Sequence, residues 1–496
     1  MQNLQDKMVE NSQPKALPIL FLAEMWERFG FYIVQGLLVL YLTQALGWSD
    51  DKSYAVTGLF TAFVYISPIV GGYIADRILG FKVSIVTGGI LLTVGYGLVA
   101  ACVNQDEFFL DMALSIIVVG NGFFKPNVGS LLGTFYEKDD PRREAGFTWF
   151  YMGINVGSML STLVAGFIKD AFGWSAGFGM ASIGLLFGTS SFLIRLNYLK
   201  GHGVMPAKKP ILSALDWLHT KTAIVVGVIV AVPLLTFLLQ EGGIATVLLS
   251  VVAFFLVIGL IVFAWKQDTL QARKKMLALI FLTVISVIFW AIFFQIYFSL
   301  NLFIDRSVDR TFWGYQIPTV AFISFEGAFI VLLSPFIARF WTYLASIRKN
   351  PSIPVKFFLS FLGMGIAFLI LTASTHFHDA AGFISPFWIP LAYLVITISE
   401  LLLSPIGLAA VTMLSSPRMV GMMMGVFLMG IGYGGKLAGV IAKFSSIPED
   451  VTNKFIESQY YGDAFFTYAL ISFAAAFIVL LFVSYLKRLI GYTPRV

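Results

Sequence analysis

The sequence predicts an all-α membrane protein with about fourteen transmembrane helices. Hydrophobic residues occupy 58% of the 496 positions and charged residues 12%, whereas an ordinary soluble chain is roughly 25% charged. Apolar stretches of about 20 residues recur along the whole chain, and each is long enough to cross a hydrocarbon core of about 30 Å as a helix. The polar segments between these stretches differ in their Lys and Arg content, which is typical of the two sides of a membrane.

Hydropathy predicts the following helices in order. We expect them at residues 17–45, 53–76, 83–103, 108–134, 145–168, 176–198, 222–240, 243–265, 276–303, 316–344, 355–375, 386–414, 419–443 and 461–486. The longest polar connection, 199–221, contains four Lys, two Pro and two Gly residues, and we interpret it as a linker between two halves.

The basic residues also predict an orientation. If the amino terminus is cytoplasmic, about 24 of the 33 Lys and Arg residues fall on the cytoplasmic side. One missed or invented helix would exchange the sides of every later loop, so this bias supports the helix count as well as the orientation. We therefore expect both termini in the cytoplasm. The polar residues 1–16 lack a signal-peptide core, so we expect the first helix to remain in the mature protein.

The helix pattern predicts six segments of the chain. They are a cytoplasmic tail at 1–16, a six-helix bundle at 17–198, a linker at 199–221, an inserted helix pair at 222–265, a second six-helix bundle at 266–488 and a tail at 489–496. The inserted pair has no charged residue except Glu241 at its turn, which is typical of helices that face lipid.

Several classes of function are disfavoured. The net charge of +6 is spread along the chain, so no basic patch indicates a nucleic-acid partner. The glycines between Gly430 and Gly435 lack the strand and helix context of a dinucleotide site. His376 and His378 are a weak metal pattern in a loop, and no Ser, His and Asp set predicts a nucleophile. We expect no cofactor, no metal and no enzymatic activity, with a membrane-embedded enzyme as a remote alternative.

Ionisable residues inside the expected helices are the main functional signal. There are seven of them, on five helices: Glu24, Glu27, Arg28, Lys125, Glu326, Glu400 and Lys436. A charge at the centre of a bilayer costs roughly 2.5–3.5 kcal/mol on insertion scales, so such groups pair, face water or serve a transport pathway. Salt bridges that only fix helix packing are the alternative, but the spread over five helices favours a pathway.

The spacing of these residues refines this interpretation. Glu24 lies one helical turn from both Glu27 and Arg28, so the first helix carries one polar face. Four carboxylates against three bases leave one acid in excess, which a low-dielectric site resolves by protonating a carboxyl or by binding a cation. Both solutions suit a proton-coupled carrier of a solute that bears an ammonium group and a carboxylate.

Local motifs resemble those of a known family. The run EMWERFGFY at 24–32 resembles the ExxERFxYY signature of the proton-dependent oligopeptide transporters, a branch of the major facilitator superfamily. The segments GGYIADRILGFK at 71–82, NGFFKPNVGSLLGTFYEKDDPRR at 121–143 and SELLLSPIGLAAVTMLSSPRMVGMMMG at 399–425 are similar to further parts of that family. The resemblance implies a major facilitator fold of two six-helix bundles plus two inserted helices.

The resemblance also implies roles for particular residues. It implies proton coupling by Glu24, Glu27 and Arg28, binding of the substrate carboxylate by Arg28 and Lys125, and binding of its amino terminus by Glu400 with Asn155. A contact between Lys125 and Glu400 is implied as a cytoplasmic gate. The remaining substrate-binding candidates are Tyr32, Gln35, Tyr65, Trp290, Glu326, Phe427 and Lys436.

Departures from the family pattern mark where this chain differs. Gln35 stands where the family often has an arginine, and Phe293, Phe294 and Gln295 stand where it often has a glutamate. Where many members show an Asn-Pro pair, this chain reads SFEGAF, which places Glu326 there. We expect Glu326 to replace the missing carboxylate, either as a second proton site or as a contact for a basic side chain.

Together these features predict a proton-coupled symporter that imports di- and tripeptides by alternating access through a bacterial inner membrane. Its expected partners are the peptide, protons and the lipid bilayer, with no nucleic acid. A proton symporter of another zwitterionic or anionic solute is the alternative.

Overall fold

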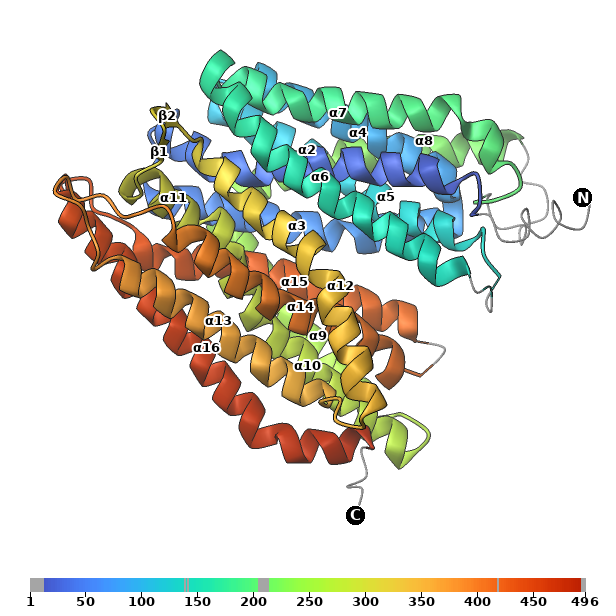
Figure 1. Ribbon diagram of the computed structural model, residues 1–496. Coiled ribbons are helices and arrows are strands. Elements are labelled where there is room, and N and C mark those ends of the chain that lie inside the picture. Colours follow the sequence, from blue (N-terminus) through green and yellow to red (C-terminus); the bar gives the residue numbers. More distant parts are fainter. Residues whose placement is uncertain (1–12, 138–139, 141, 204–213, 417–418, 492–496) are drawn as a thin grey trace, which may run out of the picture. The chain divides into compact units, whose positions relative to one another are not determined.

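The computed structural model describes residues 13–137, 140, 142–203, 214–416 and 419–491 of the chain. Helices dominate these residues (Figure 1). The α-helices are α2 (Leu17–Gln44), α3 (Asp50–Ile74), α4 (Phe81–Ala101), α5 (Glu107–Gly133), α6 (Arg142–Phe172), α7 (Trp174–Ile194), α8 (Ala214–Gln240), α9 (Gly242–Trp265), α10 (Leu270–Phe293), α11 (Ser299–Ser307), α12 (Ser324–Ser346), α13 (Ile353–Ser374), α14 (Trp388–Leu414), α15 (Val420–Ala442) and α16 (Lys454–Ile490). The shorter elements are η1 (Ala75–Leu79), η2 (Leu196–Leu199), η3 (Phe294–Tyr297), η4 (Thr319–Ile323), η5 (Lys443–Ser445), β1 (Thr311–Phe312) and β2 (Tyr315–Gln316).

The number of membrane-spanning helices agrees with the hydropathy. Within the described residues, twelve helices are long and apolar enough to cross a membrane. The helix α2, which carries three charged residues, is not among them, and the apolar part of α8, Ile224–Gln240, is short. These two complete the expected set, so the prediction of a helical, multi-pass membrane protein is confirmed. Residues 1–12, 204–213 and 492–496, within the predicted tails and linker, lie outside the described residues.

The chain divides into two compact units. Unit 1 comprises Met1–Val34 and Ile66–Gln240, and unit 2 comprises Gln35–Tyr65 and Glu241–Val496. In unit 1, α4 packs against α5 and α7, and α8 packs against α5. In unit 2, α13 packs between α14 and α16, while α10 packs against α9 and α15 (Figure 1). The second half of α2, the following turn and the first half of α3 therefore form a hairpin, residues 35–65, that belongs to unit 2.

Polar residues define several helix ends. The side chain of Asp106 accepts a hydrogen bond from the backbone N–H of Phe108 at 2.9 Å, at the start of α5. Thr269 caps α10 in the same way through the N–H of Ala272. Such caps satisfy N–H groups that have no partner within the helix. At the other end of α16, Gly491 adopts a left-handed conformation with φ 94°, which glycine reaches without a steric penalty.

Small residues let the helices of unit 1 approach closely. A Cβ atom on Gly71 of α3 would clash directly with the carbonyl group of Gly122 in α5. Pro126 follows four residues after Gly122 and has no N–H to bond to that carbonyl. The backbone of α5 therefore comes into contact with α3 at a place where only glycine fits.

The helix expected at 276–303 lies within one membrane-spanning segment, Leu270–Ser307, but this segment is not a continuous α-helix. It is interrupted into α10, η3 and α11, with Phe298 at φ −111° and ψ −106°. The side chain of Gln295 compensates at the break, since its Nε2 donates to the carbonyls of Ala291 at 3.1 Å and Ala438 at 3.0 Å. Its Oε1 accepts from the hydroxyl of Ser299 at 2.6 Å. No Pro or Gly lies in the break, so the hydropathy pattern continues across it.

Two further elements depart from the prediction. The expected helix at 316–344 begins with the 3₁₀ turn η4, and a two-residue β-hairpin, β1 and β2, precedes it. Trp313 and Gly314 at its tip both have positive φ, 51° and 83°, as a tight hairpin requires.

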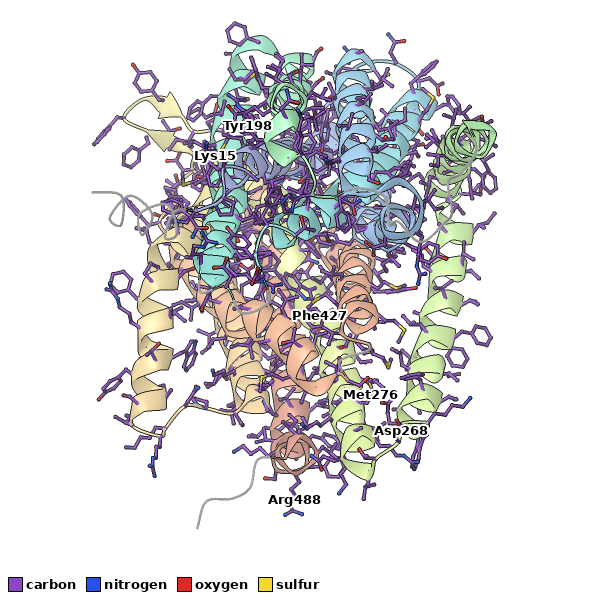
Figure 2. The ribbon with its side chains drawn as sticks, turned by 90° about the vertical axis from the view of Figure 1, so that its right-hand side faces the viewer. Lys15, Tyr198, Asp268, Met276, Phe427 and Arg488 are labelled. Carbon is purple, nitrogen blue, oxygen red and sulfur yellow. The ribbon has the colours of Figure 1, made fainter. Side chains whose placement is uncertain are left out.

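One end of unit 2 is basic. Lys266, Arg273, Lys274 and Lys275 lie around the junction of α9 and α10, and Lys487 and Arg488 lie in the last turn of α16. Asp268 and Arg488 lie towards the same end of the unit (Figure 2), and Gly491 lies against the side chain of Gln271. Chain segments more than 200 positions apart in the sequence thus place their basic residues at one end.

Candidate functional site

The first helix supplies a buried ion pair to unit 1. Arg28 Nε donates to Glu27 Oε2, and Arg28 Nη2 donates to Glu27 Oε1, both at 2.5 Å. Glu27 has 0% of its surface exposed and Arg28 4%. A guanidinium that engages both oxygens of one carboxylate is the strongest arrangement available to such a pair.

Glu24 connects this pair to α5. Lys125 Nζ donates to Glu24 Oε1 at 2.5 Å, and the same oxygen lies 3.8 Å from Arg28 Nε. Glu24 is 1% exposed, whereas the Lys125 side chain retains 30% exposure. The four charges that the sequence placed on two separate helices therefore form one network, with two acids balanced by two bases.

A further member of this network was missed by the sequence reasoning. Asn121 of α5 accepts a hydrogen bond from Arg28 Nη2 through its Oδ1 at 3.3 Å. Its signal in the sequence was its position four residues before Lys125, which places both side chains on one face of α5. An uncharged residue in a predicted helix drew no attention beside the charged ones.

Aromatic and small residues surround Arg28. Its guanidinium carbon lies 4.7 Å from the ring centre of Phe31 and 6.0 Å from that of Tyr32, within the range of cation–π attraction. A Cβ on Gly157 of α6 would come within 3.2 Å of the Arg28 Cβ, so α6 passes close by. On α6, Asn155 is buried, and its Nδ2 donates to the carbonyl of Tyr151 in the same helix at 2.9 Å.

Gln35, a predicted substrate contact, belongs to unit 2. It is fully buried, and its Nε2 donates to Thr61 Oγ1 at 3.0 Å. Thr61 in turn donates to the carbonyl of Thr57 at 2.8 Å. A Cβ on Gly435 of α15 would lie 2.4 Å from Thr61 Cγ2, so the hairpin packs directly on α15 at this point.

The aromatic candidates of unit 2 partly gather around Phe294. The ring centre of Phe294 lies 5.7 Å from that of Tyr65 and 6.0 Å from that of Trp290. Trp290 is 6% exposed, and its Nε1 has no hydrogen-bond partner within the described residues. Phe427 of α15 lies apart from them, against Gly407 of α14, and is buried.

The remaining acids of the spanning helices meet in unit 2. The carboxyl groups of Glu326 in α12 and Glu400 in α14 lie within hydrogen-bonding reach of each other. Their exposures are 5% and 9%. Neither forms a salt bridge within the described residues. Lys436 is half-buried and forms no salt bridge with either acid within the described residues. The acid in excess is therefore located in this pair.

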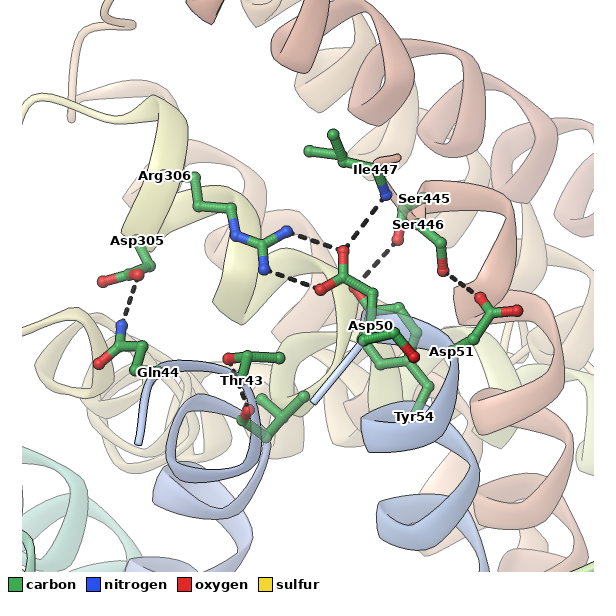
Figure 3. Close-up of polar contacts among 12 residues, drawn as sticks. Thr43, Gln44, Asp50, Asp51, Tyr54, Asp305, Arg306, Ser445, Ser446 and Ile447 are labelled. Atoms are coloured by element: carbon green, nitrogen blue, oxygen red, sulfur yellow. Dashed lines mark hydrogen bonds and ion pairs between the residues drawn. The ribbon is translucent and has the colours of Figure 1, made fainter. Parts of the chain in front are cut away.

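A second polar cluster of unit 2 was also missed. Arg306 of α11 binds both carboxylate oxygens of Asp50, with two hydrogen bonds of 2.7 Å (Figure 3). Asp50 also accepts from the backbone N–H of Ile447 at 3.3 Å. Beside it, Ser446 donates to Asp51 at 2.5 Å, and Gln44 donates to Asp305 at 2.5 Å. These contacts fasten the tip of the 35–65 hairpin to α11 and to the segment after α15.

The predicted gate between Lys125 and Glu400 joins a residue of unit 1 to one of unit 2 and stays a prediction.

No group of three or more His, Cys, Asp and Glu side chains that could hold a metal ion occurs among the described residues.

Known proteins are similar to this chain in sequence and in fold. The profile of the POT family matches residues 82–459. Dipeptide and tripeptide permease A of Enterobacter sp. (strain 638) is 34% identical over 480 residues, which cover 96% of this chain and 93% of that protein. A solved structure described under substrate recognition in proton dependent oligopeptide transporters is 31% identical, with a TM-score of 0.81, and covers 96% of this chain and 99% of its own. A mutant of the peptide transporter POT in complex with alafosfalin is 30% identical, with a TM-score of 0.83 and coverage of 97% and 96%.

Proposed function

Because this chain belongs to the POT family, we propose that it is a proton-coupled symporter that imports di- and tripeptides by alternating access. The permease relative and the peptide transporter structures support a peptide as the substrate. The observation that carries the proposal is the contact of Glu24 with Lys125, because it joins a candidate proton acceptor to a candidate carboxylate ligand.

The geometry of the unit 1 network suggests how proton and peptide are coupled. Without substrate, Lys125 neutralises Glu24 and Arg28 neutralises Glu27. A peptide carboxylate that binds Lys125 and Arg28 competes with these two acids for their cations. A buried carboxylate that loses its cation favours its protonated form. Peptide binding thereby promotes proton uptake by Glu24 or Glu27.

The other candidate residues complete the substrate site. Glu400 and Asn155 hold the amino terminus of the peptide. Tyr32, Gln35, Tyr65, Trp290, Glu326, Phe427 and Lys436 contact its backbone and side chains. Contact of Lys125 with Glu400 closes the cytoplasmic side during the transport cycle.

The membrane setting follows from the charge distribution. The basic residues at one end of unit 2 are those that the positive-inside rule assigns to the cytoplasm. We place the protein in a bacterial inner membrane with both termini cytoplasmic, lipid around its spanning helices, and protons as the coupling ion.

A second candidate function is proton symport of another zwitterionic or anionic solute. Glu326 favours it, because a second buried acid beside Glu400 changes the charge offered to the substrate. Competition by dipeptides of varied charge separates the two candidates.

Purified protein in liposomes tests the proposal. An imposed proton gradient, acidic outside, should accumulate an intact labelled dipeptide against its concentration gradient. Lys125→Ala should abolish this accumulation and also the exchange of labelled for unlabelled dipeptide without a gradient. Glu241→Gln, at the exposed turn between α8 and α9, is the matched control and should behave as the wild type. Absence of dipeptide uptake in the wild type under every gradient would sink the proposal.

A further inference from the structure

Two buried acids face each other in unit 2 without a counter-ion. Glu326 and Glu400 come from different helices, α12 and α14, and their carboxyl groups are within hydrogen-bonding reach. Two ionised carboxylates repel at this separation, whereas a carboxylic acid donates a hydrogen bond to a carboxylate. The contact is therefore compatible with one proton on the pair.

Polar atoms around the pair are left without hydrogen-bond partners. The buried Oε2 of Glu400 has no hydrogen-bond partner within the described residues. Further along the same face of α14, the hydroxyl groups of Thr397 and Tyr393 are also buried and unpartnered. The three residues are spaced by three and four positions, so they form one polar stripe on the helix. Buried polar atoms are rarely left unsatisfied. The Oε2 of Glu400 lacks a donor, and a proton on the pair or a cationic group supplies one.

The charged groups of the neighbouring helices do not balance the pair. Helices α10, α12, α13 and α15 pack against α14. Their basic side chains are Arg273, Lys274, Lys275, Arg339, Lys356 and Lys436, and none of them forms a resolved interaction with Glu326 or Glu400. Of the titratable side chains outside the pair, Tyr393 interacts with Glu326, and a phenol does not supply positive charge.

We propose that Glu326 and Glu400 share one proton, and that this proton travels with the substrate. The second half of the proposal rests on the proposed peptide symport. With one proton the pair carries a single negative charge, which matches the single positive charge of a peptide amino terminus. The proton enters from the outside with the substrate and leaves to the inside. The empty carrier returns without this proton, and the pair takes up the next proton before the substrate binds, so the resting carrier without substrate is protonated.

Infrared difference spectroscopy tests the shared proton without any substrate. In liposomes, the wild type should show the carbonyl band of a protonated carboxyl at neutral pH, and this band should shift in D₂O. Glu326→Gln and Glu400→Gln should each remove it, because the glutamine amide donates to the remaining carboxylate and keeps the site filled. Glu241→Gln should retain it.

Two infrared results would contradict the proposal that Glu326 and Glu400 share a proton. One is a band that persists in both variants. The other is a band that disappears from the wild type when sodium is added at constant pH, since the pair would then hold a metal cation instead.

Accumulation of a labelled dipeptide tests whether the proton on the Glu326 and Glu400 pair crosses the membrane with the substrate. With the membrane potential clamped at zero and a pH difference of one unit, each coupled proton multiplies the accumulation by about ten. Glu326→Gln should therefore reach a steady-state accumulation about tenfold lower than the wild type. This ratio is a thermodynamic limit, so a weaker affinity or a slower exchange in the variant does not change it. An unchanged steady-state accumulation in Glu326→Gln would refute the transport half. If the wild type itself exchanges no dipeptide, the proposed function fails. The infrared result then still decides whether Glu326 and Glu400 share a proton.

Discussion

Arg306 binds Asp50 through both of its carboxylate oxygens at 2.7 Å, although the two residues are 256 positions apart in the sequence. The Asp50 side chain is 5% exposed and that of Arg306 25% exposed, so water screens this pair only in part. The contact is the centre of the cluster that fastens the tip of the 35–65 hairpin to the rest of unit 2.

Asp50→Asn should destabilise the protein. Asparagine offers Arg306 one oxygen instead of two and no charge, so we expect a loss of about 1.5–3 kcal/mol. The apparent melting temperature in detergent should fall. Asp463→Asn, at an exposed position of α16, is the control and should melt as the wild type does. Equal melting of all three proteins would show that the contact adds nothing to stability.

Glu24→Gln should uncouple transport from the proton gradient. The substitution removes one acid from a network of two acids and two bases, and Lys125 loses its partner. We expect gradient-driven dipeptide uptake to fall at least about tenfold, which corresponds to about 1.4 kcal/mol, while exchange without a gradient continues. Exposed Glu144→Gln serves as the control. A parallel loss of uptake and exchange would instead indicate that Glu24 is needed for folding or for substrate binding.

Gly71→Ala should disturb the packing of α3 on α5. The added Cβ would overlap the carbonyl group of Gly122, and backbone atoms cannot move aside as a flexible side chain does. Overpacking of this kind costs about 1–3 kcal/mol. Gly227→Ala in α8, where no atom lies within 4 Å of the added Cβ, is the matched control. Size-exclusion profiles and melting curves of the two variants should differ, and similar profiles would contradict the close contact.

The pH dependence of the connection between α5 and α6 has a defined sign. Hydrogen bonds from the Arg142 side chain and backbone N–H hold the pKa of Asp140 below its usual value. The stabilisation is therefore complete above the unfolded-state pKa of about 3.9 and is lost as the pH falls through the lower folded-state pKa. Arg142→Gln should raise the pKa of Asp140, as measured by NMR on protein with labelled aspartate. Asp140→Asn should leave the pH profile of uptake above pH 5 unchanged, and an altered profile would assign this residue to proton coupling.

Physical constraint explains what could be predicted from the sequence. Apolar helices and paired charges suit a lipid environment, so the helical class and the shared face of Glu24, Glu27 and Arg28 followed from composition and spacing. The contact of Lys125 with Glu24 did not follow from them, because the two residues lie on different helices. Asn121 carries no charge, and its role became visible only when α2 was placed against α5. The contact between Asp50 and Arg306 joins distant segments that no periodicity relates.

The location of the unbalanced acid could not be predicted from the sequence either. Counting charges revealed that one carboxyl had no base, but the identity of that carboxyl depends on which helices pack together. The structure places Glu326 beside Glu400, and no salt bridge joins Lys436 to either of them within the described residues. Helix packing alone made this distinction.

The break after α10 has an evolutionary consequence. Because η3 and Phe298 interrupt the helix, Arg306 is carried by the nine-residue α11 and not by the long α10 that holds Trp290. Mutations in α11 can thus change the contact with the hairpin while α10 and its Trp290 keep their positions. Because the helix is interrupted between them, α10 and α11 can accept substitutions independently of each other during evolution.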